Sequence, residues 1–444
     1  MRPHRRAVAA LAATVATGLA AVSTVAAAEG PAPQTAGVWL TTQLEDGLLT
    51  NFGMPDIGLT IDALLALKAT GVAPAAAAAV ADQVAANAAT FSYYEIDYDE
   101  DGDLDRITDA GSTAKLLLAA VVAGRDPKHF GGLDLDAQTR ALIATSGPHR
   151  GRVRDTTPDV YGGDASNTFD QSLAVLGLTR SGGAPADTVA YLVRQQCPAG
   201  GFRLNPDPAG ATCTSDAAAD VDATAMAVQA VLATDPGSAA AAKAVAWLKA
   251  KQAADGSFVN GPQQPDPNLP SVANSNSTGL AGQALAAAGA TAEAGKAATW
   301  ITGLQLTTGA DQGAIAYSAE AHATGAIDDM LRDQWRRATA QAVLALAQVP
   351  LGDIGKPVTG SPSASVSASA SASPSASVSL SPSPSRSASA SPSVSASVSG
   401  SASTTPGGAL PVTGDPIMRI AAVAVGLIIA GAVLVLAARR RRTP

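Results

Sequence analysis

The sequence predicts an all-α domain in which six helical hairpins close into two concentric rings. Three observations support this architecture: a repeated pair of helices, a difference in charge between the two helices of each pair, and an alternation of short and long links. The repeat is clearest from Tyr191 to Leu232, where a helical segment, a Gly-Gly-Phe turn, a loop and a second apolar segment follow one another. Such repeats indicate supersecondary units that pack side by side.

The next copy of this unit begins at Trp247 and repeats the spacing of the turn. The pattern Gln-x-x-x-Gly-x-Phe starts at Gln196 and again at Gln252, and looser copies of the unit start at Trp39 and Trp300. The second segments recur roughly every 50 to 60 residues. They are anchored at Asp62, Gly111, Asp170, Asp222, Asn276 and Arg337.

The two helices of each unit differ in charge. The first helices are expected near 37–44, 74–91, 133–145, 185–196, 238–252 and 292–305. The second helices are expected near 61–68, 112–122, 169–179, 222–232, 277–287 and 337–348. The second set is nearly free of charge, whereas the first carries residues such as Lys243 and Lys249. Because a helix that is apolar all round is buried, the second helices form the inner ring and the first the outer ring.

The links between helices give the ring a direction. Links from an inner to the next outer helix are short, and links from an outer to an inner helix are mostly long: 92–111, 146–168, 197–221, 253–276 and 306–336. Parallel inner helices would gather these loops and their own N-termini, which carry partial positive charge, at one end of the ring, the long-loop end. Function usually lies on such loops. The candidate ligand-facing residues are Tyr161, Asn167, Phe202, Arg203, Phe258, Asn274 and Tyr317.

Composition limits the class of partner. Of the 444 residues 47% are hydrophobic and 15% charged, and the net charge is −8. The apolar residues are mainly Ala, Val and Leu, and Ala favours helices. No basic cluster lies outside the two ends of the chain, so a nucleic-acid partner is not expected.

Residues 1–28 have the pattern of a secretory signal peptide. A basic start that ends at Arg6 precedes an apolar run from Ala7 to Val25, and small residues follow at Ala26 to Ala28. This order indicates a cleaved signal rather than a retained membrane anchor. The protein is therefore expected to be exported.

Residues 36–350 resemble the repeats of terpenoid cyclases and protein prenyltransferases, whose fold is an (α/α)6 toroid. The turns at Gln196 and Gln252 are similar to the QW motif of triterpene cyclases, with Phe in place of Trp. The toroid is also similar to that of vertebrate cobalamin carriers. The resemblance therefore implies the fold, and the fold hosts both enzymes and binding proteins.

One segment resembles a catalytic motif. Residues 220–225, Asp-Val-Asp-Ala-Thr-Ala, are similar to the Asp-x-Asp-Asp-Thr-Ala segment of class II cyclases, whose middle Asp protonates an alkene. By this resemblance Asp222 would be the general acid, with Asp220 beside it. Ala223 stands where the cyclases have a further Asp.

A structural interpretation competes with the catalytic one. Asp62, Asp170 and Asn276 share the repeat position of Asp222, and Asp and Asn at the start of a helix usually serve as N-caps. We favour the cap, and with it a domain that binds a ligand or partner without catalysis. The alternative is an extracellular enzyme, either of cyclase type or acting on glycans.

Other residue types bear on these alternatives. The chain has 6 Phe, 6 Tyr and 4 Trp, few for an aromatic lining that would guide a carbocation. Its four His lack ligand spacing to a Cys, as the zinc site of prenyltransferases would need. A glycan-acting enzyme needs a carboxylate pair at an open cleft. Carboxylates are abundant on the long loops, and no pair is singled out.

An acidic segment resembles the start of a calcium loop. Gly102 occupies the sixth position, and Thr108 stands at the twelfth, where a bidentate Glu would close the loop. Alternate positions carry Asp97, Asp99, Asp101, Asp103 and Asp105. We expect these carboxylates to bind Ca2+; the alternative is a solvated acidic turn.

Two cysteines, Cys197 and Cys213, flank a short segment of one long loop. In an exported protein they are expected to form a disulfide, the alternative being two buried thiols. The chain-entropy model gives such a link roughly 3 kcal/mol of stabilisation.

The C-terminal part has the order of a cell-wall anchor. Residues 353–409 are rich in Ser, Ala and Pro and are expected to form a disordered stalk. An apolar segment, 417–438, is long enough to span a bilayer, and the basic tail 439–444 should stay cytoplasmic. Between stalk and span lies a five-residue motif, Leu410, Pro411, Val412, Thr413 and Gly414.

This motif matches the LPxTG sorting signal of Gram-positive surface proteins. By this resemblance a sortase attacks the carbonyl of Thr413, releases the chain from Gly414 onward and joins Thr413 to peptidoglycan. The chain would be inserted in the membrane before sorting and covalently attached to the cell wall afterwards. The alternative is a single-span membrane protein.

Overall fold

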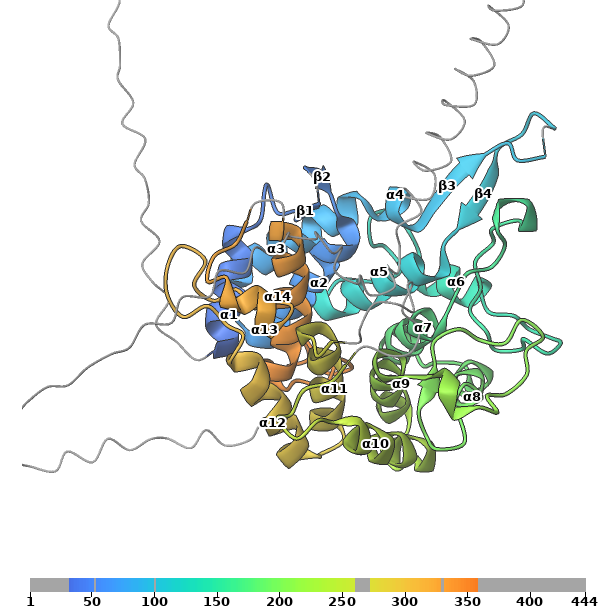
Figure 1. The fold of residues 1–444 in the computed structure, drawn as a ribbon. Helices are drawn as coiled ribbons and strands as arrows, with labels where there is room; N and C mark the ends of the chain where they lie inside the picture. Colours follow the sequence, from blue (N-terminus) through green and yellow to red (C-terminus); the bar gives the residue numbers. More distant parts are fainter. Residues whose placement is uncertain (1–31, 52, 100, 260–271, 329–330, 358–444) are drawn as a thin grey trace, which may run out of the picture.

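The computed structural model describes residues 32–51, 53–99, 101–259, 272–328 and 331–357, and their helices form two rings (Figure 1). The inner ring consists of α2 (Ile57–Thr70), α5 (Ala110–Ala123), α7 (Thr168–Ser181), α9 (Val221–Thr234), α11 (Ser275–Ala287) and α14 (Arg332–Ala347). The outer ring consists of α1 (Ala32–Thr42), α3 (Pro74–Ala86), α6 (Leu135–Ala141), α8 (Ala186–Val193), α10 (Ala239–Lys251) and α12 (Thr291–Thr302). Short helices lie in the links: α4 (Ala88–Ser92), α13 (Ala319–Ala323), η1 (Asp159–Tyr161) and η2 (Asp216–Ala218).

The inner ring is closed. Successive inner helices pack against one another in the order α2, α5, α7, α9, α11 and α14, and α14 packs against α2, so the two ends of the domain lie side by side (Figure 1). Each outer helix covers the seam between two adjacent inner helices. Neighbouring inner helices are parallel, because side chains at equal distances from their starts bond to each other, as Lys115 does to Asp62. The predicted (α/α)6 toroid is confirmed.

Small residues let the inner helices approach closely. A Cβ atom added to Gly279 of α11 would lie 2.7 Å from the Cα of Ala342 in α14. One helix turn later, a Cβ on Gly282 would lie 2.9 Å from the Cβ of Ala345. Contacts this short require glycine and alanine, so the Ala-rich and Gly-rich composition of the second helices follows from the packing of the ring.

Glutamines just after the outer helices bridge successive repeats. The Nε2 atom of Gln196 donates to the carbonyl of Gly200 in its own turn (2.9 Å) and to that of Ala240 in α10 (2.8 Å). Gln252 makes the same pair of bonds one repeat later, at 3.0 and 2.9 Å. The motif thus fastens each turn to the next outer helix.

A third glutamine closes the ring. Gln305 donates to the carbonyl of Gly313 in its own turn (3.0 Å) and to that of Ala32, the first residue of α1 (2.9 Å). The last repeat is therefore bonded to the first in the same way as the internal repeats are bonded to each other.

In the third repeat the glutamine comes from the inner ring instead. Nε2 of Gln171 in α7 donates to the carbonyls of Gly151 and of Thr188 in α8, both at 2.9 Å, while its Oε1 accepts from the Val153 amide. Gln171 thus makes the pair of donor bonds that Gln196, Gln252 and Gln305 make in their repeats. It also accepts from a loop amide, a bond that a threonine of the inner helix accepts in four other repeats.

The turn glycines touch the backbone of the next outer helix. A Cβ on Gly200 would lie 2.6 Å from the Lys243 carbonyl, and a Cβ on Gly256 would overlap the Lys296 carbonyl. Both glycines have positive φ, of 117° and 96°. Glycine is needed here for its conformation and for the close approach.

A matched pair of substitutions separates these two requirements. Gly256→Ala should lower the free energy of unfolding more than Gly309→Ala, because Gly309 also has positive φ (87°) but nothing within 4 Å of its Cβ position. The overlap alone should cost about 1–3 kcal/mol. Urea denaturation of the two variants measures the difference, and equal losses would contradict the close contact.

Three antiparallel hairpins lie in links that the sequence had assigned to loops. They are β1 (Thr50–Asn51) with β2 (Met54–Pro55), β3 (Tyr93–Ile96) with β4 (Asp105–Thr108), and β5 (Phe202–Arg203) with β6 (Ala219–Asp220). The β3–β4 hairpin projects from the helical body (Figure 1). Its sequence, Tyr-Tyr-Glu-Ile opposite Asp-Arg-Ile-Thr, is rich in residues that favour strands. The all-α prediction holds for the rings and misses these hairpins.

The C-terminal end of the toroid extends further than the sequence predicted. Residues 349–356, the strap, cross the end of the ring opposite the long loops, and Ile354 is fully buried. Arg180 donates to the Ile354 carbonyl (2.6 Å) and to the Val121 carbonyl of α5 (3.0 Å). Residues 353–356 therefore belong to the toroid, because the buried Ile354 side chain and the half-buried Arg180 hold them there.

The predicted disulfide is confirmed. Cys197 and Cys213 are bonded, with their Cα atoms 4.7 Å apart, and both are buried. The bond closes the loop between α8 and α9 at the long-loop end.

The expected signal (1–28), the stalk beyond residue 357, the sorting motif (410–414), the membrane span (417–438) and the tail (439–444) lie outside the described residues. Within the described ranges, no helix is both long and apolar enough to cross a membrane.

Candidate functional site

The helix caps at the long-loop end differ from those that the sequence predicted. The N-caps, whose side-chain oxygens accept from first-turn amides, are Asp56, Asp109, Asn167, Asp220 and Asn274. The residues expected as caps lie within the helices instead: Asp62, Asp170, Asp222 and Asn276. That prediction is wrong for Asp62, Asp222 and Asn276, because each helix begins before the repeated residue. Asp170 keeps part of a capping role, because its Oδ2 atom accepts from the Asn167 amide (2.8 Å) and completes a capping box.

A repeated hydrogen bond places the inner helices in one register. In four repeats a loop amide donates to a threonine of the inner helix, at 2.7–2.9 Å; these are Thr60, Thr224, Thr278 and Thr339. Gln171 accepts the equivalent bond in α7, and Thr113 is the matching residue of α5. Equivalent residues of all six helices can therefore be compared by counting from these positions.

Counting in this way defines a stripe of three layers on each inner helix. The mouth layer contains Gly58, Gly111, Phe169, Asp222, Asn276 and Arg337. The middle layer contains Asp62, Lys115, Leu173, Met226, Leu280 and Gln341. The floor layer contains Leu65, Leu118, Leu176, Gln229, Gln283 and Leu344. Spacings of four and three residues keep each stripe on one helix face.

Contacts between helices show that the stripes face the ring axis. In the middle layer, Lys115 Nζ lies 2.6 Å from Asp62 Oδ1, and Gln341 Nε2 donates to Asp62 Oδ2 at 3.3 Å. In the floor layer, Gln229 Nε2 donates to Gln283 Oε1 at 3.1 Å. Side chains of the same layer on adjacent helices thus meet.

The strap closes the floor. The Leu351 amide donates to Gln229 Oε1, and Gln283 Nε2 donates to the Val349 carbonyl, both at 2.8 Å. Gln229 and Gln283, which bond to each other between the adjacent helices α9 and α11, therefore also hold the strap beneath the ring axis. The ring is covered at this end and faces the long loops at the other.

The stripes of the six inner helices face a common space around the axis, the chamber. Side chains off the stripe, such as Ile61 and Leu64, are 0% exposed, and so are Leu118, Leu176 and Gln283 of the floor layer. Half of the stripe residues retain 4 to 9% exposure: Asp62, Leu65, Lys115, Phe169, Leu173, Asp222, Met226, Leu280 and Leu344. Because these come from all six inner helices, water-accessible surface lies on every side of the axis. The wall combines apolar side chains and glycines with eight polar or charged side chains.

Asp222 is the most perturbed acid of this chamber. Burial, and secondarily the nearby charge of Asp220, raise its pKa well above the ordinary value, while the Ser277 hydroxyl opposes the shift. Its Oδ1 atom is buried without a hydrogen-bond partner. The shift favours the protonated form of Asp222, whose hydroxyl can donate a hydrogen bond.

Two further buried oxygens of the stripe lack partners. They are Oδ1 of Asn276, beside Asp222 in the mouth layer, and Oε1 of Gln341 in the middle layer. A buried polar atom left unpaired costs about 1–3 kcal/mol, so their persistence is a mark of a binding site.

The structure relocates most of the candidate ligand-facing residues. Phe202 and Phe258 are 0% exposed and belong to the hydrophobic core, because the turn before each directs its ring inward. Arg203 is buried and donates to the Gln195 side chain. The expectation that these three contact a ligand is corrected.

The other four candidates have mixed positions. Asn167 and Asn274 cap α7 and α11, and Tyr317 is buried, with its carbonyl accepting from the Ser275 amide. Tyr161 alone among the seven is exposed, at 49%. None of the seven belongs to the stripes.

Sequence reasoning missed Lys115, Phe169 and Gln341. Lys115 and Gln341 each come two residues after a threonine in an inner helix, and Phe169 comes two residues before Gln171. This spacing is the signal that could have found them. Asp222 and Asn276 of the mouth layer were predicted as caps, a role that they do not have, and Asp222 was also named as an alternative general acid; Gly111 and Arg337 served only as anchors of the repeat.

A second group of carboxylates surrounds the start of α5. Asp155 accepts from the amides of Ala110 (2.8 Å) and Ala165 (3.0 Å), and Asp109 caps the same helix. Burial, and then the charge of Asp109, raise the pKa of Asp155 to about 6. Asp170, fully enclosed beside them, has its pKa raised well above the ordinary value by burial and then by Asp109.

The Asp155 shift predicts a pH dependence of stability. The folded state binds this proton more tightly than the unfolded state, so its stabilising contribution is complete below pH 3.8 and is lost as the pH rises to about 6. Relative to the Asp155→Asn variant, the free energy of unfolding of the parent should fall by at most about 3 kcal/mol across this pH window. Denaturant unfolding at several pH values measures it. The control Asp82→Asn, at an exposed ion pair, should run parallel to the parent.

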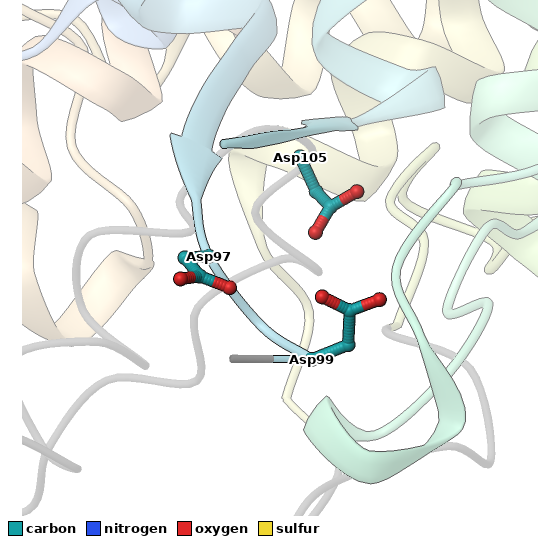
Figure 2. A group of neighbouring side chains, drawn as sticks. All are labelled: Asp97, Asp99 and Asp105. Carbon is teal, nitrogen blue, oxygen red and sulfur yellow. The ribbon is translucent and has the colours of Figure 1, made fainter. Parts of the chain in front are cut away.

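The acidic loop joins β3 to β4. Asp97, Asp99 and Asp105 each place one carboxylate oxygen within 4.8 Å of the others (Figure 2). Oδ1 of Asp97 and Oδ2 of Asp105 are buried without a partner. Asp101 and Asp103 of the expected five are not members of this group, and Asp101 instead accepts from the Asp103 amide. Calcium stays a prediction, with three candidate ligands.

Thermal melting with and without Ca2+ tests the predicted calcium site. Ca2+ at about 100 times its Kd would stabilise the folded chain by about 2.7 kcal/mol, so the melting temperature should rise with Ca2+ and fall with chelator. Asp97→Asn should abolish this response, and the matched Asp103→Asn should keep it, since Asp103 lies outside the group. An unchanged melting temperature of the parent would reject the site.

Comparison with known proteins gives one local sequence match. A drimenyl diphosphate synthase from Streptantibioticus cattleyicolor is 36% identical over 118 residues, which is 25% of this chain and 21% of that protein. The chain thus spans about a fifth of the length of the curated relative that it matches. No protein-family model matches the chain.

Solved structures share the fold. An unsaturated glucuronyl hydrolase specific for heparin is similar with a TM-score of 0.50 and 11% identity, over 72% of this chain and 98% of that chain. The type II terpene cyclase MstE from Scytonema gives 0.47 and 15%, over 72% and 97%. A protein from Actinoplanes gives 0.48 and 20%, over 71% and 98%. At such identity the hydrolase match supports the toroid alone.

Proposed function

We propose that this is an exported, wall-anchored surface protein whose toroid binds a small ligand in the chamber without converting it. The observation that carries the proposal is the chamber itself: partly accessible side chains from all six inner helices surround the ring axis, among them Leu, Met and Phe side chains and buried oxygens without partners. Pockets that bind small molecules are typically of this kind, apolar with a few convergent polar groups.

The anchoring part of the proposal rests on the sequence. A signal-like start, an LPxTG motif at 410–414, an apolar segment and a basic tail occur in the order that sorting requires. Sortase would join Thr413 to peptidoglycan in a Gram-positive cell wall. The strap is the last described segment before the stalk, so the toroid would be displayed with the strap end toward the stalk.

The ligand can be sought directly. Leu280→Trp fills the middle layer with a larger side chain, so we expect the exported protein to lose any small molecule that native mass spectrometry finds bound to the parent. The matched control Leu104→Trp, at a 69% exposed position of the acidic loop, should keep it. A molecule that Leu280→Trp retains, or that both variants lose alike, would refute binding in the chamber.

A second candidate is an enzyme of terpenoid-cyclase type with Asp222 as general acid. It is favoured by the finding that Asp222 is not the cap: Asp220 accepts from the Ala223 amide at 2.8 Å, and burial raises the pKa of Asp222 well above its ordinary value. The local match to a drimenyl diphosphate synthase points the same way.

One substitution separates the two candidates. Asp222→Asn removes the transferable proton and keeps the size and polarity of the side chain. A cyclase would lose turnover completely, whereas a binding protein would keep its ligand unchanged in mass. Mass spectrometry of the ligand before and after incubation with each form decides between them.

A further inference from the structure

The charges that face the chamber cancel one another. In the middle layer Lys115 is paired with Asp62 at 2.6 Å, and both side chains are about a tenth exposed (10% and 12%). In the mouth layer Arg337 is paired with Asp56, the cap of α2, at 2.9 Å. Among the described stripe residues, Lys115 and Arg337 are the cations, so none is left to neutralise a phosphate group.

The polar groups without partners are complementary to each other. Asp222 has a buried carboxyl oxygen without a partner, which offers a hydroxyl proton when the group is protonated, and Asn276, at the same level of the adjacent helix α11, offers an amide oxygen. Both side chains are more than nine-tenths buried, with 4% and 3% exposed. A single hydroxyl group satisfies both, because it accepts one hydrogen bond and donates another.

One turn beneath these two groups, α9 and α11 present apolar side chains, while the polar side chains of the middle layer, Asp62, Lys115 and Gln341, lie on other helices. Met226 and Leu280 follow Asp222 and Asn276 one turn deeper on the same helices. Leu173, Leu65 and Leu344 line the other sides of the axis. A ligand that enters from the long-loop end with its apolar body toward the floor would keep its polar end at the mouth.

We propose that the ligand of this chamber is an uncharged, apolar molecule with one hydroxyl group, which accepts from Asp222 and donates to Asn276. This inference rests on the proposed binding function and adds the class of ligand. It sets the chamber apart from sites for diphosphate esters, because a double negative charge would meet only cations that already have partners.

Three probes with one apolar body test it: 1-decanol, decyl methyl ether and decyl phosphate. Their affinities for the full-length protein can be measured by competition with a fluorescent fatty alcohol. The alcohol should bind roughly five- to tenfold more tightly than the ether, which leaves Asn276 unpaired, and the phosphate should bind most weakly. Asn276→Leu should remove the preference for alcohol over ether, and Asp222→Leu should weaken both alike.

The control is Asp187→Leu, on the outer helix α8, which should behave as the parent. Both chamber variants replace a buried polar atom that has no partner, so their melting temperatures should not fall, which separates a lost contact from a lost fold. Equal affinities for alcohol and ether in the parent, or tightest binding of the phosphate, would overturn the inference.

The two proposals fail in different ways. If the molecule expelled by Leu280→Trp is charged, the class of ligand is wrong and binding in the chamber stands. If the parent carries no molecule and binds none of the probes, both proposals fall.

Discussion

The closure of the ring is the constraint on which the rest of the structure depends. Gln305 donates from one amide nitrogen to its own turn at Gly313 and to Ala32 at the start of the first helix. The bond resembles those of Gln196 and Gln252, so the seam between the last and first repeats is built like the internal seams. A chain of hairpins without this return contact would form an open superhelix with exposed end faces.

Closure gathers the starts of the inner helices around one axis, and this explains the varied states of the buried acids. Asp62 lies beside Lys115, and the ion pair compensates its charge. Asp155 is partly compensated, because two backbone amides donate to it. Asp222 has neither form of compensation for its Oδ1 atom, and burial raises its pKa. The two stripe cations, Lys115 and Arg337, are paired, which leaves hydrogen bonding and apolar contact as the means of recognition in the proposed binding function.

The misassigned caps show why local patterns were insufficient for the site. A repeat places Asp62, Asp170, Asp222 and Asn276 at similar intervals, and Asp and Asn suit a helix start equally well. The true starts depend on where each loop returns to the ring, which the repeat spacing does not encode. The same holds for Gln171: its role matches that of the outer-helix glutamines, but it belongs to an inner helix, and only the folded third repeat brings it to the turn at Gly151.

The sequence by itself determined the two rings, their order and the disulfide. These follow from properties that each segment carries alone, namely the charge-poor second helices, the repeated turn glycines and two cysteines in a chain expected to be exported. The tertiary structure decided the chamber, the strap beneath it and the raised pKa of Asp222. Each of these depends on which side chains of different repeats meet across the axis, and on how much water their packing excludes. Such distances arise only when all six hairpins are closed together.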